Sequence, residues 1–413
     1  MTTAKIDISE LFEAYYDCRK NKRHTANALA FEMDYESKLI NLCEEINNGV
    51  YTPGRSIAFI VEKPVKREIF AADFRDRVVH HLVVNKLNPH FEKQFIYDSY
   101  GCRTDRGSHM GIKRVTRFIR KCSRNYQSPC YILKLDIEGF FMHINKDILF
   151  SRLLSFINKN YAAHDKDLII ELCEKIIFNN PTENCKIKGK KTDWNGLPLS
   201  KSLFHSAINC GLPIGNLTSQ IFANFYLDSF DHYVKHDLQI SYYGRYVDDF
   251  VVVHNDKAYL KSLIPQMANF LNSMLGLNLH PRKIYLQSYE KGVSFLGSVI
   301  KPHRVYIASR TKGGFYDTIA SWNKMIRNKK KLKPAEWDSF LSSINSYLGI
   351  LKHYKTYKLR KKMLRQNLSA CFYNYVYISG GYSKLVSKIK PTTKCQSFRA
   401  KRKNRKVKLL MDC

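Results

Sequence analysis

Two adjacent acidic residues, Asp248 and Asp249, lie between two apolar runs that are typical of β-strands. The runs cover 242–247 and 250–253, and so short a separation predicts a β-hairpin with both acids at its turn. Neighbouring carboxylates repel each other, and a divalent cation bound by their oxygens would compensate that repulsion. An acidic surface hairpin without any chemistry would show the same pattern, so this segment alone leaves both interpretations open.

A third acid, Asp136, ends an apolar run that begins at Tyr131 and is followed by a turn at Gly139. This pattern predicts a buried strand that closes on Asp136. A lone acid at a strand end is ordinarily a cap. If the strand lies beside the hairpin, however, three carboxylates share one sheet edge, and such a set holds two Mg²⁺ ions about 4 Å apart for phosphoryl transfer. We therefore predict a polymerase active site.

Five sequence blocks stand in the order and at the spacings of reverse transcriptase motifs. They are LKLDIEGFF, GLPIGNLTSQ, YVDDF, LNLHPRKIYL and VSFLG, and the chain resembles that family from about Ser56 to Gly297. The resemblance implies an α+β right-hand polymerase with fingers, a ferredoxin-like palm with helices on one sheet face, and a short helical thumb. The implied boundaries are 1–50 for an N-terminal helical extension, 51–130 for the fingers, 131–305 for the palm with some fingers elements in 145–210, 306–380 for the thumb and 381–413 for a basic C-terminal tail.

The resemblance also implies roles for individual residues around the acids. Two Mg²⁺ ions, for which Mn²⁺ could substitute, would be held by Asp136, Asp248, Asp249 and the backbone carbonyl of Ile137. Lys283 would serve as general acid or charge stabiliser at the leaving pyrophosphate. The incoming deoxynucleotide would be contacted by Lys66, Arg67, Phe141, Ile214, Gly215 and Gln220. Among these, Arg67 would bind phosphate oxygens through its planar guanidinium, and Phe141 would exclude a ribose 2′-OH.

Primer and template contacts are implied for two further segments. In the glycine-rich basic stretch 99–108, Arg103 and Arg106 would contact backbone phosphates. Phe295, Leu296 and Gly297 would form the hairpin that positions the 3′ end of the primer.

Two features make the chain similar to reverse transcriptases of diversity-generating retroelements, within the group II intron-like lineage. One is the segment WNGLPLSKSLF at 194–204, and the other is Ile214, which stands where most reverse transcriptases have glutamine. An apolar side chain cannot donate the hydrogen bond that helps to hold the nascent base pair, so discrimination against mispairs should weaken. The resemblance implies misincorporation opposite template adenines. Ile214 does not explain why adenine is selected, and a packing role for Ile214 is the alternative.

The balance of charge predicts a polyanionic partner, because 68 Lys and Arg stand against 36 Asp and Glu and give a net charge of +32. The implied partners are a template-repeat RNA, the RNA–cDNA duplex, dNTPs and a small basic oligomeric accessory protein. No apolar run is long enough for a membrane span and no signal peptide is visible, so we expect a cytoplasmic protein encoded by a bacterium, an archaeon or a phage. Eleven cysteines without Cys-x-x-Cys spacing predict free thiols.

Two alternative functions remain open at this point. The first is a retron or stand-alone group II-like reverse transcriptase, although the Val-Thr-Gly that retrons usually carry after the palm is not found. The second is an RNA-binding scaffold that keeps the palm but has lost catalysis, against which the intact acid triad argues.

Overall fold

The chain divides into two compact units, Met1–Tyr289 and Glu290–Cys413, each of which has its own hydrophobic core. This computed structural model describes residues 5–20, 25–62, 65–329 and 332–388. Within those ranges, no helix combines the length and the apolar composition that crossing a membrane would require.

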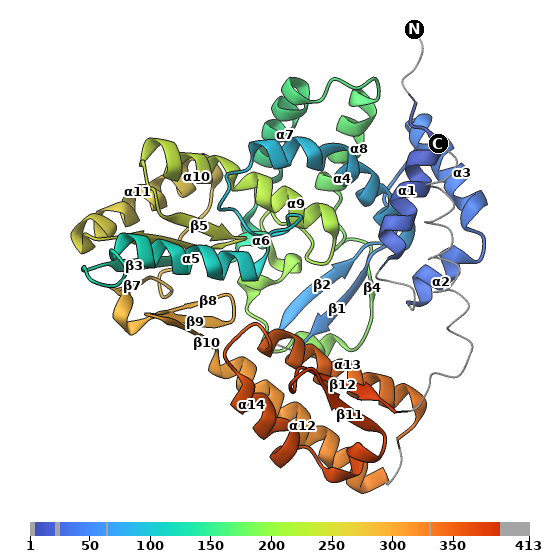
Figure 1. Cartoon of the computed structure of the whole chain (residues 1–413). Coiled ribbons are helices and arrows are strands. Elements are labelled where there is room, and N and C mark those ends of the chain that lie inside the picture. Colours follow the sequence, from blue (N-terminus) through green and yellow to red (C-terminus); the bar gives the residue numbers. More distant parts are fainter. Residues whose placement is uncertain (1–4, 21–24, 63–64, 330–331, 389–413) are drawn as a thin grey trace, which may run out of the picture. The chain divides into compact units, whose positions relative to one another are not determined.

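Three helices begin the first unit, within the range 1–50 for which a helical extension was predicted. They are α1 (Ile8–Arg19), α2 (Ala26–Glu32) and α3 (Tyr35–Asn47). Helix α1 starts at a capping box, in which Asp7 accepts a hydrogen bond from the backbone of the first turn and Glu10 accepts one from Asp7. Its buried face packs on the long helix α4 (Phe74–Gln94), which follows the first sheet (Figure 1).

That first sheet has the order β2-β1-β4. Strands β1 (Ile57–Val61) and β2 (Arg67–Ala71) form an antiparallel hairpin within the range predicted for the fingers. The short strand β4 (Lys186–Ile187) pairs with β1 in parallel, through backbone donation from Lys186 to Ser56 and from Lys188 to Ala58. The segment 179–205, which starts polar and lysine-rich and is called the insertion below, therefore contributes a strand to this sheet. It continues through three short 3₁₀ turns, η1 (Lys191–Trp194), η2 (Leu199–Lys201) and η3 (Leu203–His205).

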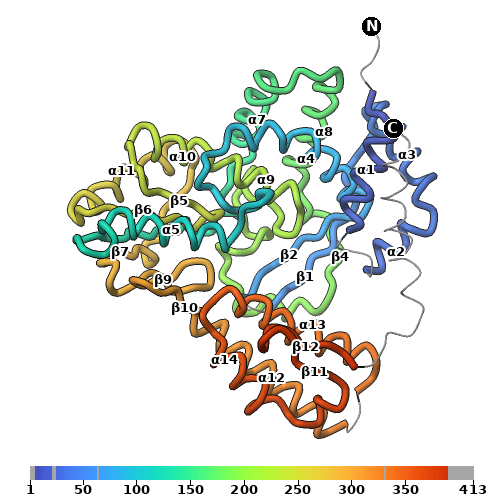
Figure 2. Tube along the Cα trace, viewed as in Figure 1, coloured from blue at the N-terminus to red at the C-terminus, as the bar shows by residue number. Residues whose placement is uncertain are grey.

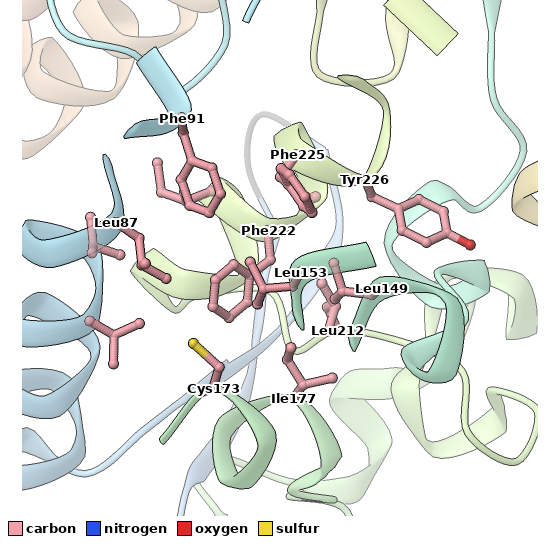
Figure 3. Close-up of a cluster of buried hydrophobic side chains, with 14 of the residues drawn as sticks. Leu87, Phe91, Leu149, Leu153, Cys173, Ile177, Leu212, Phe222, Phe225 and Tyr226 are labelled. Carbon is pink, nitrogen blue, oxygen red and sulfur yellow. The ribbon is translucent and has the colours of Figure 1, made fainter. Parts of the chain in front are cut away.

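A layer of helices forms the centre of the first core. It consists of α4, α7 (Lys146–Asn160), α8 (Lys166–Phe178) and α9 (Leu217–Tyr226). Figure 3 shows Leu87 and Phe91 of α4, Leu153 of α7, Ile177 of α8 and Phe222 of α9 pointing toward one another. The ring of Phe91 lies 4.9 Å from that of Phe156 and 5.0 Å from that of Phe225, measured between centroids. These aromatic contacts fix α9, which leads toward the acid-bearing sheet.

The second sheet of this unit carries the three acids and has the order β5-β6-β3-β7, with every neighbouring pair antiparallel. Its strands β5, β6 and β7 can be located on the chain trace in Figure 2. The strands are β3 (Tyr131–Asp136), β5 (Tyr243–Tyr246), β6 (Asp249–His254) and β7 (Tyr285–Ser288). One face packs Leu133, Leu135 and Phe250 into the main core beside the helices α10 (Asp228–His232) and α11 (Lys257–Leu275).

The opposite face of this sheet is also covered. Side chains alternate along a strand, so Ile132 and Val251 point away from Leu133 and Phe250, yet both are buried. Helix α5 (Ser108–Cys122) packs against β5 and β6. The prediction that helices cover one face only is therefore wrong, because α5 supplies a second apolar layer.

The second unit begins with a separate antiparallel sheet of β8 (Val293–Phe295), β9 (Ser298–Lys301) and β10 (Arg304–Ile307). The boundary between the units thus falls inside the range 131–305. Helices α12 (Ser309–Lys329), α13 (Pro334–Leu351) and α14 (Tyr357–Lys362) follow, in agreement with the helical pattern.

A closing hairpin in the second unit was not expected. It consists of β11 (Val376–Ser379) and β12 (Lys384–Ser387). The side chain of Asn345 accepts a hydrogen bond from the Leu385 backbone N–H at 2.7 Å and donates one to its carbonyl at 2.9 Å. The start of the predicted basic tail is therefore a strand docked on α13, and residues 389–413 of that tail lie outside the described residues.

Candidate active site

The three acids come together at one end of the second sheet, although Asp136 and Asp248 are more than a hundred residues apart in the sequence. The register of β3 with β6 sets Asp136 directly opposite Asp249. The hairpin of β5 and β6 closes with Tyr246 opposite Asp249, which leaves Val247 and Asp248 as the two turn residues. The end of β3 and the turn between β5 and β6 thus lie side by side, as predicted.

The electrostatics of these acids reflect their burial and their mutual repulsion. Burial raises the pKa of Asp249 to about 6; the charges of Asp248 and Asp136 act in the same direction, and Lys134 opposes them. The pKa of Asp248 is also raised, chiefly by burial and then by the charge of Asp136. A positive charge bound between these carboxylates would relieve both effects.

Two lysines supply positive charge at the acids. Lys283 Nζ lies 2.8 Å from Asp136 Oδ1, and Lys134 Nζ lies 3.1 Å from Asp249 Oδ1. The loop that carries Lys283 is tied to the end of β3, because the His280 N–H donates to the Asp136 carbonyl at 2.8 Å. The structure therefore places Lys283, predicted as a catalytic residue, against the first acid.

The donor set fits a hard divalent cation. Among the described residues, no group of three or more His, Cys, Asp or Glu side chains has the arrangement of a preformed metal site. Nevertheless, Asp249 Oδ1 is buried and accepts no well-aligned hydrogen bond. Carboxylate oxygens are the ligands that Mg²⁺ prefers.

Ile137, whose backbone carbonyl was predicted to bind the cation, is buried opposite Leu279. The adjacent hydrogen bonds use the Asp136 carbonyl and the Glu138 N–H.

The predicted phosphate-binding cations differ in their surroundings. Arg67 is exposed at the start of β2, and its charge lowers the pKa of Asp248, so its guanidinium lies within electrostatic range of the acids. Lys66 donates to the Asn195 carbonyl at 2.9 Å and pairs with Glu62 at 3.1 Å. Arg67 is therefore available to a ligand, whereas Lys66 is already bonded to the insertion.

The predicted nucleotide pocket residues lie where α6 (Phe140–His143) and the GLPIG block meet. Phe141 is half-buried, and its carbonyl accepts a hydrogen bond from the Leu212 N–H at 2.8 Å. The Ile214 carbonyl accepts one from the Phe70 N–H at 2.8 Å, which ties the block to β2. The side chain of Ile214 packs on a small cluster that includes Phe70.

Gly215 and Gln220 have protein contacts that the sequence does not reveal. Gly215 has a φ of +128°, and a Cβ added there would lie 2.8 Å from Ile69 Cγ2. Packing on β2 is thus enough to require glycine at this position. Gln220 is exposed on α9, and its Oε1 lies 3.5 Å from the Sγ of Cys102, which belongs to the basic stretch 99–108.

The two predicted phosphate contacts in the 99–108 stretch have different outcomes. The side chain of Arg103 is 3% exposed, and it donates to Glu92 at 2.9 Å and to the carbonyls of Ile96 and Ser99. Its assignment to phosphate is wrong, because Glu92 and two backbone carbonyls already bind this buried guanidinium. Arg106 is half-buried over the Tyr97 ring, 4.3 Å from its centroid, and forms no ion pair within the described part of the chain.

The predicted primer hairpin belongs to the second unit. Leu296 and Gly297 both have positive φ, at 49° and 77°, and they form the two-residue turn between β8 and β9. Such turns match the twist of a hairpin. Phe295 is buried just before the turn. The local hairpin is thus present, and its role toward a primer stays a prediction.

One residue at the site was missed from the sequence. Glu68 on β2 is 1% exposed and accepts hydrogen bonds from Trp194 Nε1 at 2.7 Å, Ser202 Oγ at 2.8 Å and the Leu203 N–H at 2.5 Å. It therefore fastens the insertion to the strand that carries Arg67. An acid at a buried position of a predicted strand was the available signal.

Comparisons with known proteins agree with this geometry. The profile of the family described as reverse transcriptase (RNA-dependent DNA polymerase) matches residues 63–300. The putative COX1/OXI3 intron 2 protein of Saccharomyces cerevisiae is 23% identical over 342 residues, which cover 71% of this chain and 38% of the yeast protein. The mitochondrial nuclear intron maturase 1 of Arabidopsis thaliana is 28% identical over 111 residues, covering 25% of this chain and 15% of the plant protein.

Among solved structures, telomerase from Candida albicans aligns with a TM-score of 0.42 and 11% sequence identity, over 76% of this chain and 64% of that chain. The chain thus spans well under half of the two curated relatives and somewhat less than two thirds of this structure. The family match covers more than half of the 413 residues and includes the three acids. The chain therefore belongs to the reverse transcriptase (RNA-dependent DNA polymerase) family.

Proposed function

We propose that this chain is an RNA-directed DNA polymerase whose active site is the acid cluster of β3 and the β5–β6 turn. The observation that carries the proposal is the register that sets Asp136 opposite Asp249, with Asp248 in the adjoining turn. Members of this family generally use divalent metal ions. Two Mg²⁺ ions at Asp136, Asp248 and Asp249 would activate the primer 3′-OH and neutralise charge on the reacting phosphate.

The remaining residues bind and orient the substrates. The exposed guanidinium of Arg67 binds phosphate oxygens of the deoxynucleotide, and the ammonium of Lys283 stabilises charge on the leaving pyrophosphate. Lys283 is suited to this because its side chain remains 48% exposed while it pairs with Asp136. The half-buried ring of Phe141 lies after the Asp136 strand and excludes a ribose 2′-OH.

The direct test replaces the two turn acids. Asp248→Ala with Asp249→Ala should abolish extension of a DNA primer on an RNA template in Mg²⁺, because the cation loses its ligands. RNA binding, measured by fluorescence anisotropy, should persist because the cationic surface is unchanged. Glu290→Gln, an acid of the second unit, serves as a control for general loss of charge. Retained synthesis by the double variant would refute the proposed mechanism.

We further propose that the enzyme is the reverse transcriptase of a diversity-generating retroelement, with a template-repeat RNA and a small basic accessory protein as partners. Support comes from Ile214, which occupies the place of a glutamine donor, and from the ordered insertion that contains Trp194. Because Ile214 cannot donate to the nascent pair, mispairs are opposed less strongly.

Fidelity measurements test this second proposal. Ile214→Gln should lower the frequency of errors opposite template adenine without abolishing synthesis, since the backbone hydrogen bond to Phe70 does not depend on this side chain. The readout is the error spectrum of sequenced cDNA, with Ile214→Leu as a control that keeps the apolar character. An unchanged error spectrum in Ile214→Gln would mean that Ile214 has only a packing role.

A further inference from the structure

The turn that carries Asp248 contains a backbone conformation that its residue type disfavours. Val247 has a φ of +57°. A β-branched side chain in the left-handed region is rare, and such strain persists only where surrounding contacts impose it. Gly101 lies directly against this residue, since a Cβ added to Gly101 would stand 2.9 Å from Val247 Cγ2. The contacts that impose this conformation on Val247 therefore also determine the position of Asp248.

Arg245 supplies a direct hold on Val247. Its side chain is 0% exposed, and its Nη1 donates to the Val247 carbonyl at 2.9 Å. The backbone of Arg245 is also fixed, because its N–H donates to the Asp98 carbonyl and its carbonyl accepts from the Tyr100 N–H. The guanidinium thus contacts the turn from strand β5, whose backbone is held by these hydrogen bonds.

Asp231 on α10 orients that guanidinium. Arg245 Nε donates to Asp231 Oδ1 at 2.7 Å and Nη2 donates to Oδ2 at 2.5 Å, and both side chains are fully buried. The Tyr243 hydroxyl donates to the same Oδ1 at 2.6 Å. A bidentate pair fixes the plane of the guanidinium. The remaining Nη1 is then directed at Val247.

We infer that Arg245, oriented by Asp231, is a positioning residue that holds Val247 in its left-handed conformation and thereby places Asp248 beside Asp136. Both side chains are fully buried, so their effect on the site passes through the turn. The inference rests on the proposed polymerase function, because the quantity that it controls is the arrangement of the cation-binding acids.

The first arm of the test compares two buried carboxylates. Arg245→Lys and Asp231→Asn should lower kcat at least about tenfold, leave KM for the deoxynucleotide nearly unchanged and raise the Mg²⁺ concentration for half-maximal rate. Asp165→Asn is the matched control, because the side chain of Asp165 is also 0% exposed. It accepts a hydrogen bond from the Tyr161 hydroxyl and forms an ion pair with Lys86. Asp165→Asn should lower the melting temperature without moving the Mg²⁺ dependence.

The second arm is a rescue. Asparagine adopts the left-handed conformation more readily than valine, so adding Val247→Asn to Arg245→Lys should restore much of the rate that Arg245→Lys alone loses. Mn²⁺ binding followed by electron paramagnetic resonance should weaken in Arg245→Lys and recover in the double variant. Additive losses without rescue, or losses that track melting temperature as in Asp165→Asn, would overturn the inference. A wild-type chain that binds Mn²⁺ but makes no DNA would instead contradict the proposed function.

Discussion

Asp228 illustrates how one buried carboxylate makes stability depend on pH. Burial raises its pKa to about 6, although Gln94 donates to it at 2.6 Å. Between pH 4 and 6 the folded chain keeps a proton that the unfolded chain has released, so this group favours folding below that interval and opposes it above. We expect Asp228→Asn to raise the free energy of unfolding at pH 7.5 by about 1–2 kcal/mol. Urea unfolding at pH 4.5 and 7.5 measures the free energy of unfolding of the wild type and of Asp228→Asn. An identical pH dependence in the two proteins would contradict the prediction.

At the same scale, motifs predicted which residues share the site but not how each is bonded. Asp136 and Asp249 were predicted from strand and turn patterns and Lys283 from the resemblance to reverse transcriptases, and the structure brings these residues together. Arg103 stands in an equally basic motif, yet it is buried against Glu92. The partner of a cation is set by tertiary packing, which a motif does not encode.

Among the elements, those with a strong apolar periodicity could be predicted from the sequence, and those with a weak periodicity could not. The hairpin of β5 and β6 and the helices α1 and α3 have clear apolar patterns and were predicted. Strand β4 lies in a polar, lysine-rich segment, and it pairs with β1 because its backbone N–H groups at Lys186 and Lys188 donate to the distant carbonyls of Ser56 and Ala58. Such long-range pairing leaves no local signal.

The ordered insertion leads to a prediction about template binding. Lys188 and Lys191 are exposed on a segment that β1 and Glu68 hold in place. Because the segment is fastened to the strand of Arg67, these lysines should contact the unpaired template ahead of the primer end. We expect Lys188→Gln with Lys191→Gln to weaken binding of duplexes with a 5′ template overhang, and to leave blunt duplexes nearly unchanged.

Anisotropy titrations with the two duplexes would measure this difference. Lys257→Gln with Lys261→Gln, which removes two exposed lysines of α11, is the control of equal charge. Equal weakening by both pairs of substitutions, or equal weakening for both duplexes, would show that only the total charge matters.

For the whole molecule, composition predicted a nucleic-acid partner but not the division into units. The acid-bearing sheet belongs to the first unit, whereas Leu296 and its hairpin belong to the second, and the boundary falls at Tyr289. Apolar content is continuous across that point. The division arises from which strands pair, since β8, β9 and β10 form their own sheet.

The net charge of +32 leads to a prediction about salt for the complete chain. Binding to RNA releases counterions from each neutralised phosphate, so affinity should fall steeply as KCl increases. For 6–10 phosphate contacts the loss between 50 and 200 mM is about 10³–10⁵-fold. Anisotropy at several KCl concentrations gives the slope of log affinity against log salt, and Lys188→Gln with Lys191→Gln should reduce it by about 2. The Asp248→Ala, Asp249→Ala variant should keep the wild-type slope, because its lesion is confined to the acids. An affinity insensitive to KCl would mean that base and ribose contacts, rather than the basic surface, hold the RNA.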